Sequence, residues 1–112
     1  MKLLKSLAVL SLVLYPAAVS SAEDIALSGN NMGIWTSGNG EDIIRVTTPD
    51  KIVNNWGCTD PDSYIVRSTS VTQVKERIYA TLLSAKAHGM SLTIRVQGCE
   101  SDRPAILDVL WR

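Results

Sequence analysis

The stretch that decides the fold is VTQVKERIYATLLSAKAHGMSLTIRVQGC, residues 71–99 of a 112-residue chain. Its apolar residues first recur every three or four positions, which places them on one stripe of a helix. They are Val71, Val74, Ile78, Leu82 and Ala85, with Tyr79 and Leu83 widening the stripe and Lys75, Glu76 and Lys86 on the outer side. Glycine tolerates the left-handed conformation that ends many helices, so Gly89 marks the end. The pattern predicts a helix over residues 71–88, with Ser70 and Gln73 as a capping box at its start.

Strands flank the predicted helix on both sides. Leu92, Ile94 and Val96 alternate with polar residues, which is the period of a strand with one buried face. The same reasoning predicts strands at 25–27, 34–36, 42–47, 63–67 and 105–111, with glycine-rich turns at 28–31 and 37–40 joining the first strands as hairpins. Grouped as about three strands before the helix and two after it, these segments have the element order of an OB-fold. This order predicts an α+β fold, a small OB-like five-stranded sheet or barrel with one helix between strands 3 and 4 and one disulfide.

The first 22 residues have the pattern of a secretion signal. Lys2 and Lys5 precede an apolar run over residues 7–19, and small residues at 20–22 offer a signal-peptidase site. The run is shorter than the roughly 20 residues of a spanning helix, although a retained membrane anchor is the alternative. We therefore expect cleavage after Ala22. The remaining residues 23–112 are expected to form a single secreted or periplasmic domain without stable membrane insertion.

Cys58 and Cys99 are the only cysteines in the chain. In an oxidising compartment two thiols most simply form one disulfide, which here would tie together the two ends of the helix-bearing unit. Closing a loop of this length stabilises a domain by roughly 4 kcal/mol in the chain-entropy model. A metal site would need about four ligands, with His88 the only other strong candidate, and a redox pair usually has C-x-x-C spacing. We expect a structural disulfide, no metal and no cofactor.

Charge and side-chain chemistry argue against several function classes. Loss of Lys2 and Lys5 with the signal leaves nine basic and eleven acidic residues, and the basic ones are scattered along the chain. A surface that tracks phosphates needs clustered Lys and Arg, so we expect no nucleic-acid partner. Because no G-x-S-x-G elbow or other nucleophile–base pattern is present, we expect no enzyme. We interpret His88 as a helix-end residue, and Asp60 and Asp62 as carboxylates of a solvated turn.

Trp56, together with Asn54 and Asn55, forms the most suggestive group of side chains. An exposed indole can cover the C–H face of a sugar while amides hydrogen-bond its hydroxyls. These three residues and Trp35, which lies between two glycine-rich turns, are the predicted ligand-binding residues. In the alternative interpretation Trp56 packs over the nearby disulfide as part of the core, and Trp35 could serve either use. Trp111 ends the last strand and is expected to cap the core.

A longer tract resembles known proteins. It runs from Cys58 through Tyr64-Ile65-Val66 and Ile78-Tyr79-Ala80-Thr81-Leu82-Leu83-Ser84-Ala85 to Leu92-Thr93-Ile94-Arg95-Val96-Gln97-Gly98-Cys99. The tract is similar to small secreted bacterial proteins of unknown function that end in a helix, Leu-Leu-x-Ala, a strand and Gly-Cys. More distantly, the layout resembles the receptor-binding B subunits of AB5-type toxins of the subtilase-cytotoxin and typhoid-toxin types. This resemblance, over residues 58–110, implies an OB-fold, pentamers and glycan binding, and it carries no glycan-contacting residue onto this chain.

Together, the sequence patterns and the resemblance predict a secreted or periplasmic, non-catalytic binding module. Its expected ligand is a glycan or a host or envelope surface, and a homo-oligomer is one of the assemblies to test. The alternative is a periplasmic inhibitor or accessory protein that binds one protein partner. A secreted enzyme is the third hypothesis, because the geometry of a cleft cannot be seen in a sequence.

Overall fold

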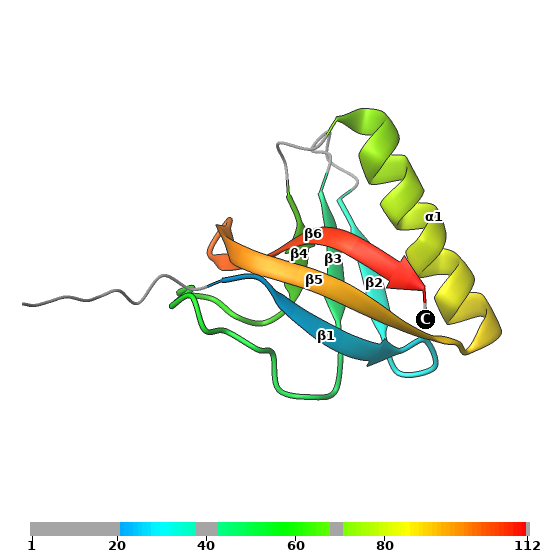
Figure 1. The fold of residues 1–112 in the computed structure, drawn as a ribbon, viewed down its shortest axis with the longest axis horizontal. Helices are drawn as coiled ribbons and strands as arrows, with labels where there is room; N and C mark the ends of the chain where they lie inside the picture. The colour runs from blue at the N-terminus through cyan, green and yellow to red at the C-terminus, as the bar shows by residue number, and fades with distance from the viewer. Residues whose placement is uncertain (1–20, 38–42, 68–70, 112) are drawn as a thin grey trace, which may run out of the picture.

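The computed structural model describes residues 21–37, 43–67 and 71–111, with the backbone alone for Trp111. Over these residues the chain forms a small α+β domain with one helix, a six-stranded mixed sheet and one disulfide (Figure 1). In chain order the elements are β1 Glu23–Ser28, β2 Gly33–Thr36, β3 Ile44–Thr47, β4 Tyr64–Val66, α1 Thr72–His88, β5 Ser91–Glu100 and β6 Arg103–Trp111. Residues 1–20 of the predicted signal and 38–40 of the second glycine-rich turn lie outside the described residues.

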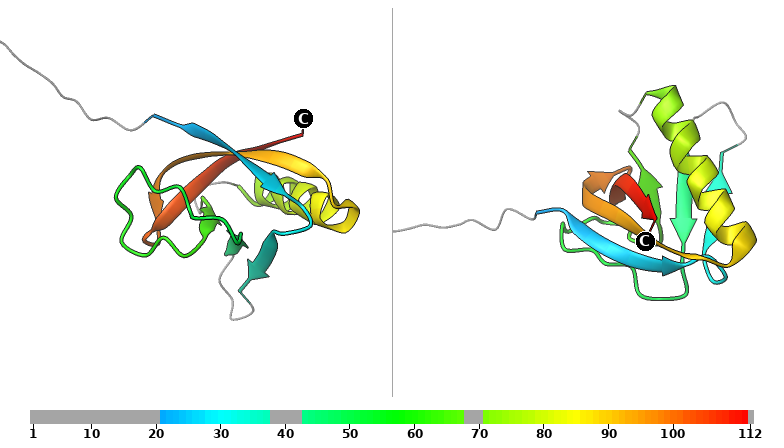
Figure 2. Two further views of the ribbon diagram at one scale, coloured as in Figure 1. Left: turned by 90° about the horizontal axis from the view of Figure 1, so that it is seen from below. Right: turned by 45° about the vertical axis from the view of Figure 1, so that its right-hand side comes forward.

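The sheet places two consecutive strands at its opposite ends. The strand order is β1-β5-β6-β4-β3-β2. Every neighbouring pair is antiparallel except the parallel pair β4–β6. β1 pairs with β5, whereas β2, which follows after residues 29–32, pairs with β3. Figure 2 shows the resulting sheet as strongly curved, with α1 lying along one side.

The expected five strands with a helix between strands 3 and 4 need correction. The described part of the chain has six strands, and α1 lies between β4 and β5. The predicted hairpin between the first two strands is wrong, because β1 and β2 pair with different neighbours. The cause lies at residues 28–32, where the N–H groups of Asn31 and Met32 both donate to Ser28 O at 3.1 Å. This tight turn redirects the chain from one end of the sheet order to the other.

Gly29 lies where that turn meets the C-terminal end of α1. Its N–H donates to Met90 O at 3.0 Å, and a Cβ at this position would lie 2.1 Å from Ala85 O. Lys86 adds a second connection, since its ammonium donates to Met32 O at 2.6 Å. The turn can follow the helix this closely only because glycine has no side chain. Direct contact with α1 therefore separates β1 from β2.

α1 begins one residue later than predicted and presents a different face to the sheet. Val71 is the N-cap, makes no side-chain cap hydrogen bond and is 61% exposed, so the predicted stripe does not include it. The capping box is not formed around this N-cap, and Ser70 lies outside the described residues. The buried helix residues are Lys75, Ile78, Leu82 and Ala85. Lys75, predicted on the outer side, is therefore inside, and Leu83, predicted to widen the buried stripe, is exposed.

The predicted end of the helix is confirmed. Gly89 has φ 64°, in the left-handed region, and the Met90 N–H donates to Ala85 O at 2.9 Å. This hydrogen bond satisfies a carbonyl that the helix itself leaves free. The helix end and the Gly29 turn consequently meet around one helix carbonyl, Ala85 O, which accepts from Met90 and lies against Gly29.

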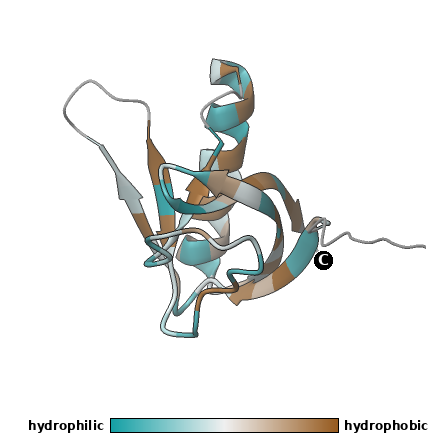
Figure 3. Cartoon of the chain, turned by 90° about the vertical axis from the view of Figure 1, so that its left-hand side faces the viewer, coloured by the Kyte–Doolittle hydropathy of each residue, from teal (hydrophilic) through white to brown (hydrophobic). Residues whose placement is uncertain are grey.

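The core lies between α1 and one face of the sheet. Leu92, Ile94 and Val96 on β5 are almost completely buried, which confirms the alternation predicted for this strand. Figure 3 shows hydrophobic and hydrophilic residues alternating along the strands and the helix. The other large side chains with almost no exposure are Met32, Val46, Tyr64, Leu82 and Ile106. One continuous cluster thus joins the helix to most of the sheet.

The predicted disulfide between Cys58 and Cys99 is confirmed. It joins the long 48–63 connection between β3 and β4 to the end of β5. Asn54 shapes the connection, because its Nδ2 donates to Cys58 O and the Cys58 N–H donates to Asn54 Oδ1, both at 2.9 Å. The Val53 N–H donates to the Tyr64 hydroxyl at 2.9 Å, and burial raises the pKa of Tyr64. A segment without regular secondary structure is thereby attached to the sheet at several points.

Replacement of Gly29 by alanine should destabilise the domain strongly. The added Cβ would overlap a carbonyl of α1, which cannot move without the whole helix. We expect the free energy of unfolding to fall by about 2–3 kcal/mol, measured by urea denaturation. Gly57→Ala is the matched control, since Gly57 has φ 71° but no atom within 4 Å of an added Cβ, and it should lose only about 1 kcal/mol. Equal losses in the two variants would show that the turn is not held against the helix.

Loss of the disulfide should loosen the 48–63 connection and destabilise the whole domain. We expect reduction, or the double variant Cys58→Ser/Cys99→Ser, to lower the free energy of unfolding by about 2–5 kcal/mol. Asn54→Ala in the oxidised protein should cost less, about 1–3 kcal/mol, because it leaves the Cys58 main-chain groups without partners while the covalent bond persists. Thermal melting with and without reductant measures both effects. A melting temperature that reductant does not change would contradict the stabilising role of the disulfide.

Candidate functional site

The predicted sugar-binding residues lie on two different segments. Asn54, Asn55 and Trp56 belong to the 48–63 connection, beside a cavity of about 710 Å³ lined by residues 51–55 and Pro61. Both polar ends of the Asn54 side chain bind the Cys58 main chain. The Asn55 amide donates to the Glu23 carboxylate. These two amides therefore shape the connection in the structure.

Trp56 is half-buried and packs against the core cluster. Its carbonyl oxygen lies 3.8 Å from the Cys99 sulfur, so the residue is next to the disulfide. The indole N–H is buried and has no hydrogen-bond partner in the described part of the chain. This position corresponds to the alternative in which Trp56 packs near the disulfide.

Trp35 is the exposed tryptophan among the described side chains. It lies on β2 with 44% of its surface exposed, and its register partner on β3 is Arg45. The Arg45 guanidinium carbon lies 4.3 Å from the centroid of the Trp35 ring. At this distance a guanidinium is attracted by the electrons of the ring face, an interaction of about 0.5–1 kcal/mol at exposed sites. The indole and the guanidinium therefore hold each other in place on the outer side of the β2–β3 hairpin.

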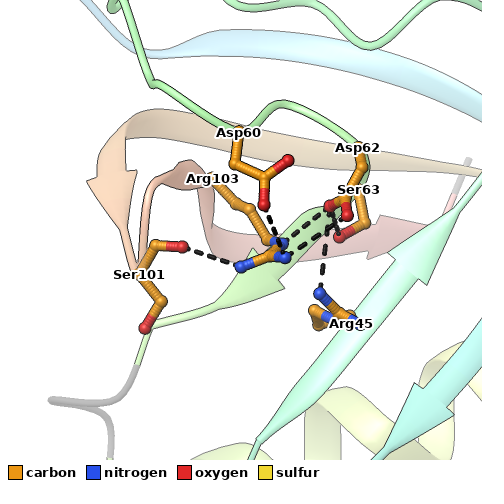
Figure 4. A network of polar contacts seen from close by, with 6 residues as sticks. All are labelled: Arg45, Asp60, Asp62, Ser63, Ser101 and Arg103. Carbon is orange, nitrogen blue, oxygen red and sulfur yellow. Dashed lines mark hydrogen bonds and ion pairs between the residues drawn. The ribbon is translucent and has the colours of Figure 1, made fainter.

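Besides Trp35, Arg45 contacts a network of carboxylates and arginines, which Figure 4 shows without the tryptophan. Its Nη1 lies 3.9 Å from Asp62 Oδ1. Arg103 Nε donates to the same oxygen at 2.7 Å, and Arg103 Nη2 donates to Asp62 Oδ2 at 3.3 Å and to Asp60 Oδ2 at 3.0 Å. Ser63 Oγ donates to Asp62 Oδ1 at 2.9 Å. We call Arg45, Asp60, Asp62 and Arg103 the arginine–carboxylate network.

Two turns bring the network together from distant parts of the sequence. The β5–β6 hairpin turns at Ser101 and Asp102, both with positive φ (47° and 67°), as in a two-residue type I′ turn. Arg103 follows as the first residue of β6, and its Nη1 donates back to Ser101 O at 2.9 Å. The Asp60 N–H donates to Asp102 O at 2.9 Å, which fixes the acidic turn beside the hairpin. Backbone hydrogen bonds thus set the separation of the charged groups.

The network also controls the charge of Asp62. The hydrogen bond from Arg103 lowers the pKa of Asp62 below its ordinary value, against a smaller opposing effect of burial. The same hydrogen bond raises the pKa of Arg103. Asp62 is therefore a carboxylate throughout the neutral range and accepts hydrogen bonds, and it is a poor proton donor. This arrangement suits binding of hydroxyls or amides better than general acid catalysis.

Sequence reasoning found only part of this site. The predicted ligand-binding residues include Trp35, whereas the sequence predicts that Asp60 and Asp62 are carboxylates of a solvated turn. Arg45 and Arg103 were missed, because each occupies an ordinary polar position on a predicted strand or turn. Only the pairing of β2 with β3, and the approach of the β5–β6 turn to the acidic turn, place them together. The alternation of β3 gives a weak signal for Arg45, because it places this residue on the face of the strand opposite the buried Ile44 and Val46.

Other chemistry-bearing features of the described residues are sparse. No group of three or more His, Cys, Asp or Glu residues that could hold a metal ion occurs among them. His88 lies at the end of α1, with its Nδ1 2.9 Å from Ser84 O, consistent with its interpretation as a helix-end residue. Within the same described ranges, no helix is long and apolar enough to cross a membrane.

Fold and site together define a small, disulfide-bonded α+β domain with an exposed tryptophan beside a network of charged residues. No family model matches the chain. Searches of curated proteins and of solved structures also found no match.

Acidification should weaken the arginine–carboxylate network. Because the pKa of Asp62 is lower in the folded protein than in the unfolded chain, its ionised form stabilises the fold above about pH 4 and this contribution is lost as the pH falls further. We expect the melting temperature to drop between about pH 5 and pH 3, and to drop less in Asp62→Asn. Asp50→Asn, at an exposed turn outside the network, should keep the wild-type slope. A slope unchanged by Asp62→Asn would mean that Arg103 does not bind the ionised carboxylate.

Proposed function

We propose that this protein is a secreted or periplasmic, non-catalytic module that binds a glycan or a glycan-bearing surface through Trp35. The observation that carries the proposal is an exposed indole fixed beside a guanidinium and a carboxylate. We define the Trp35 surface as Trp35, Arg45 and Asp62. An aromatic face covers the C–H groups of a sugar ring, and the charged groups beside it can donate to and accept from its hydroxyls.

Preorganisation supports the proposal. Arg45 is held between the Trp35 ring and Asp62, and Asp62 is held by two nitrogens of Arg103. Arg103 itself is only 17% exposed, so its side chain is packed before any ligand arrives. Fixing a long side chain on binding costs roughly 0.5–1.5 kcal/mol, and a surface already ordered avoids much of that cost.

The strand pairings support an OB-like barrel. If β1 and β2 are one first strand interrupted at residues 29–32, the order becomes that of five strands with a helix between the third and fourth. The parallel pair β4–β6 then joins the third and fifth strands of that scheme, while the interrupted strand reaches both ends of the sheet order. Barrels of this type bind oligosaccharides and oligonucleotides, although a shared fold does not establish a shared function.

A periplasmic inhibitor or accessory protein is the second candidate, and exposed apolar side chains favour it. Leu83 lies on the outward face of α1 and is 41% exposed, with Ala80 and Ala87 exposed on the same side of the helix. Such a strip could contact a protein partner or another copy of this chain. The mass in solution separates these cases, because a stable homo-oligomer agrees with the toxin-like resemblance and a monomer that co-purifies with one enzyme agrees with the inhibitor hypothesis.

Trp35→Ala should abolish most glycan binding without unfolding the protein. Loss of an aromatic platform worth about 1.4 kcal/mol corresponds to a tenfold weaker affinity, to be measured on a glycan array and then by calorimetry with the glycans that bind. Trp35→Phe should retain an intermediate affinity because it keeps an aromatic face.

Leu83→Ala is the matched control, since it also removes an exposed apolar side chain but lies on α1. It should bind glycans as the wild type does. The proposal is wrong if the wild-type protein binds no glycan on the array, or if Trp35→Ala binds as tightly as the wild type with its melting temperature unchanged.

A further inference from the structure

β2 forms one end of the sheet, and its outer edge has no neighbouring strand among the described residues. The Ser37 N–H donates to Ile43 O at 3.1 Å, so these two opposing residues form a hydrogen-bonded pair. Such pairs alternate along an antiparallel ladder, so Trp35 also turns its main chain toward β3. Ile34 and Thr36 turn their N–H and C=O groups the other way, toward the outer edge. We call these main-chain groups of Ile34 and Thr36 the β2 edge.

The β2 edge lacks the features that usually keep a sheet edge from pairing. Charged side chains, proline and bulges on an edge strand disfavour the addition of another strand. Gly33–Thr36 contains no charged residue and no proline, and its register with β3 is regular. β1, at the other end of the sheet, instead carries Glu23 and Asp24, and Asn55 donates to the Glu23 carboxylate. Of the two ends of the described sheet, the β2 edge is therefore the one suited to an added strand.

α1 lies beside the sheet on the side that ends in β2 (Figure 1). A cleft of about 280 Å³ lies between the β2–β3 hairpin and the first two turns of the helix. Its walls include Thr36 and Ile44 from the hairpin, and Thr72 and Tyr79 from α1. A strand added along β2 would therefore have a pocket beside it, bounded by the helix.

The cleft can take one side chain of such a strand. Successive side chains of a strand point to opposite faces of the sheet. Thr36 is in register with the buried Ile44, so this face of the hairpin is the one turned toward α1. Lys75 and Ser37 have interaction partners within the chain, and no ligand contact is assigned to them. Ile44 and Tyr79 supply apolar surface, which favours an apolar side chain in the cleft.

We propose that the β2 edge binds an extended segment of a partner protein as an additional strand. The occupant is a polypeptide, because an extended main chain repeats its donors and acceptors at the two-residue spacing that separates Ile34 from Thr36. In this mode main-chain hydrogen bonds supply affinity, and a pocket for one of the alternate side chains supplies specificity. The proposal goes beyond glycan binding, since the Trp35 side chain lies with Arg45 on the other face of the hairpin.

Amide hydrogen exchange of the ¹⁵N-labelled exported protein tests the edge directly. In the protein alone, the amides of Ile34 and Thr36 should exchange rapidly, whereas the Trp35 amide should be protected by β3. The probe is a peptide selected on the wild-type protein from a phage-displayed library of random segments of about seven residues. At about 90% saturation with this peptide, exchange at Ile34 and Thr36 should slow about tenfold, with Trp35 unchanged.

Thr36→Pro removes one N–H from the β2 edge and none that faces β3, so the domain should keep a melting temperature close to that of the wild type. The selected peptide should bind this variant about tenfold more weakly. Thr36→Val is the matched control, because it changes the same side chain but keeps the N–H, and it should bind as the wild type does.

N-methylation of the selected peptide tests the same pairing without altering the protein, in case Thr36→Pro does not fold. Methyl groups on the alternate residues whose N–H groups face β2 should abolish binding. The same number of methyl groups on the intervening residues, whose N–H groups face away, should leave binding intact.

Three results would overturn the inference. Protection of Ile34 and Thr36 that rises with protein concentration, together with a dimer mass, would make a second copy of this chain the occupant. Failure to select any peptide, or a selected peptide that protects other amides, would show that the edge takes no strand. Equal binding of the two methylated peptides would show that main-chain pairing does not carry the affinity. Glycan-array binding that still depends on Trp35 would show in each case that only the β2-edge proposal had failed.

Discussion

The close contact between the Gly29 turn and the last turn of α1 is the constraint on which the rest of the structure depends. It holds the chain at the point where it leaves β1, beside β5, and turns toward β2, beside β3. The pairing of β2 with β3 then sets Trp35 against Arg45 and Thr36 against Ile44. The Trp35 surface therefore follows from one backbone contact that tolerates no side chain.

The second constraint is the attachment of the 48–63 connection. The disulfide, the Asn54 side chain and the Tyr64 hydroxyl hold its middle, while Arg103 holds its acidic end. Without these contacts Asp62 would belong to a free turn, and its carboxylate would have no fixed relation to Trp35. In a domain of this size the hydrophobic core alone gives a small margin of stability. The disulfide and the charged contacts therefore do much to hold this segment in one conformation.

The β2–β3 hairpin presents different chemistry on its two sides. One side carries an exposed aromatic ring and fixed charges, and the other faces a cleft of mixed polarity against α1. The rigid elements around it supply the order that the proposed binding surface needs.

The sequence by itself determined the local elements and the disulfide. Periodicity predicted α1, the alternation of β5 and the glycine that ends the helix, because these depend on residues close together in the chain. Two cysteines behind a predicted secretion signal were enough for the covalent pairing. Trp35 was also recognised as a candidate.

Only the tertiary structure decided that β1 and β2 pair with different strands, that the Lys75 side chain is buried, and that the amides of Asn54 and Asn55 shape the 48–63 connection. It also brought Arg45 and Arg103 to Asp62, across 17 and 41 positions of sequence. The physical reason is that such contacts arise from strand register and from the packing of the helix on the sheet, which local propensity does not encode.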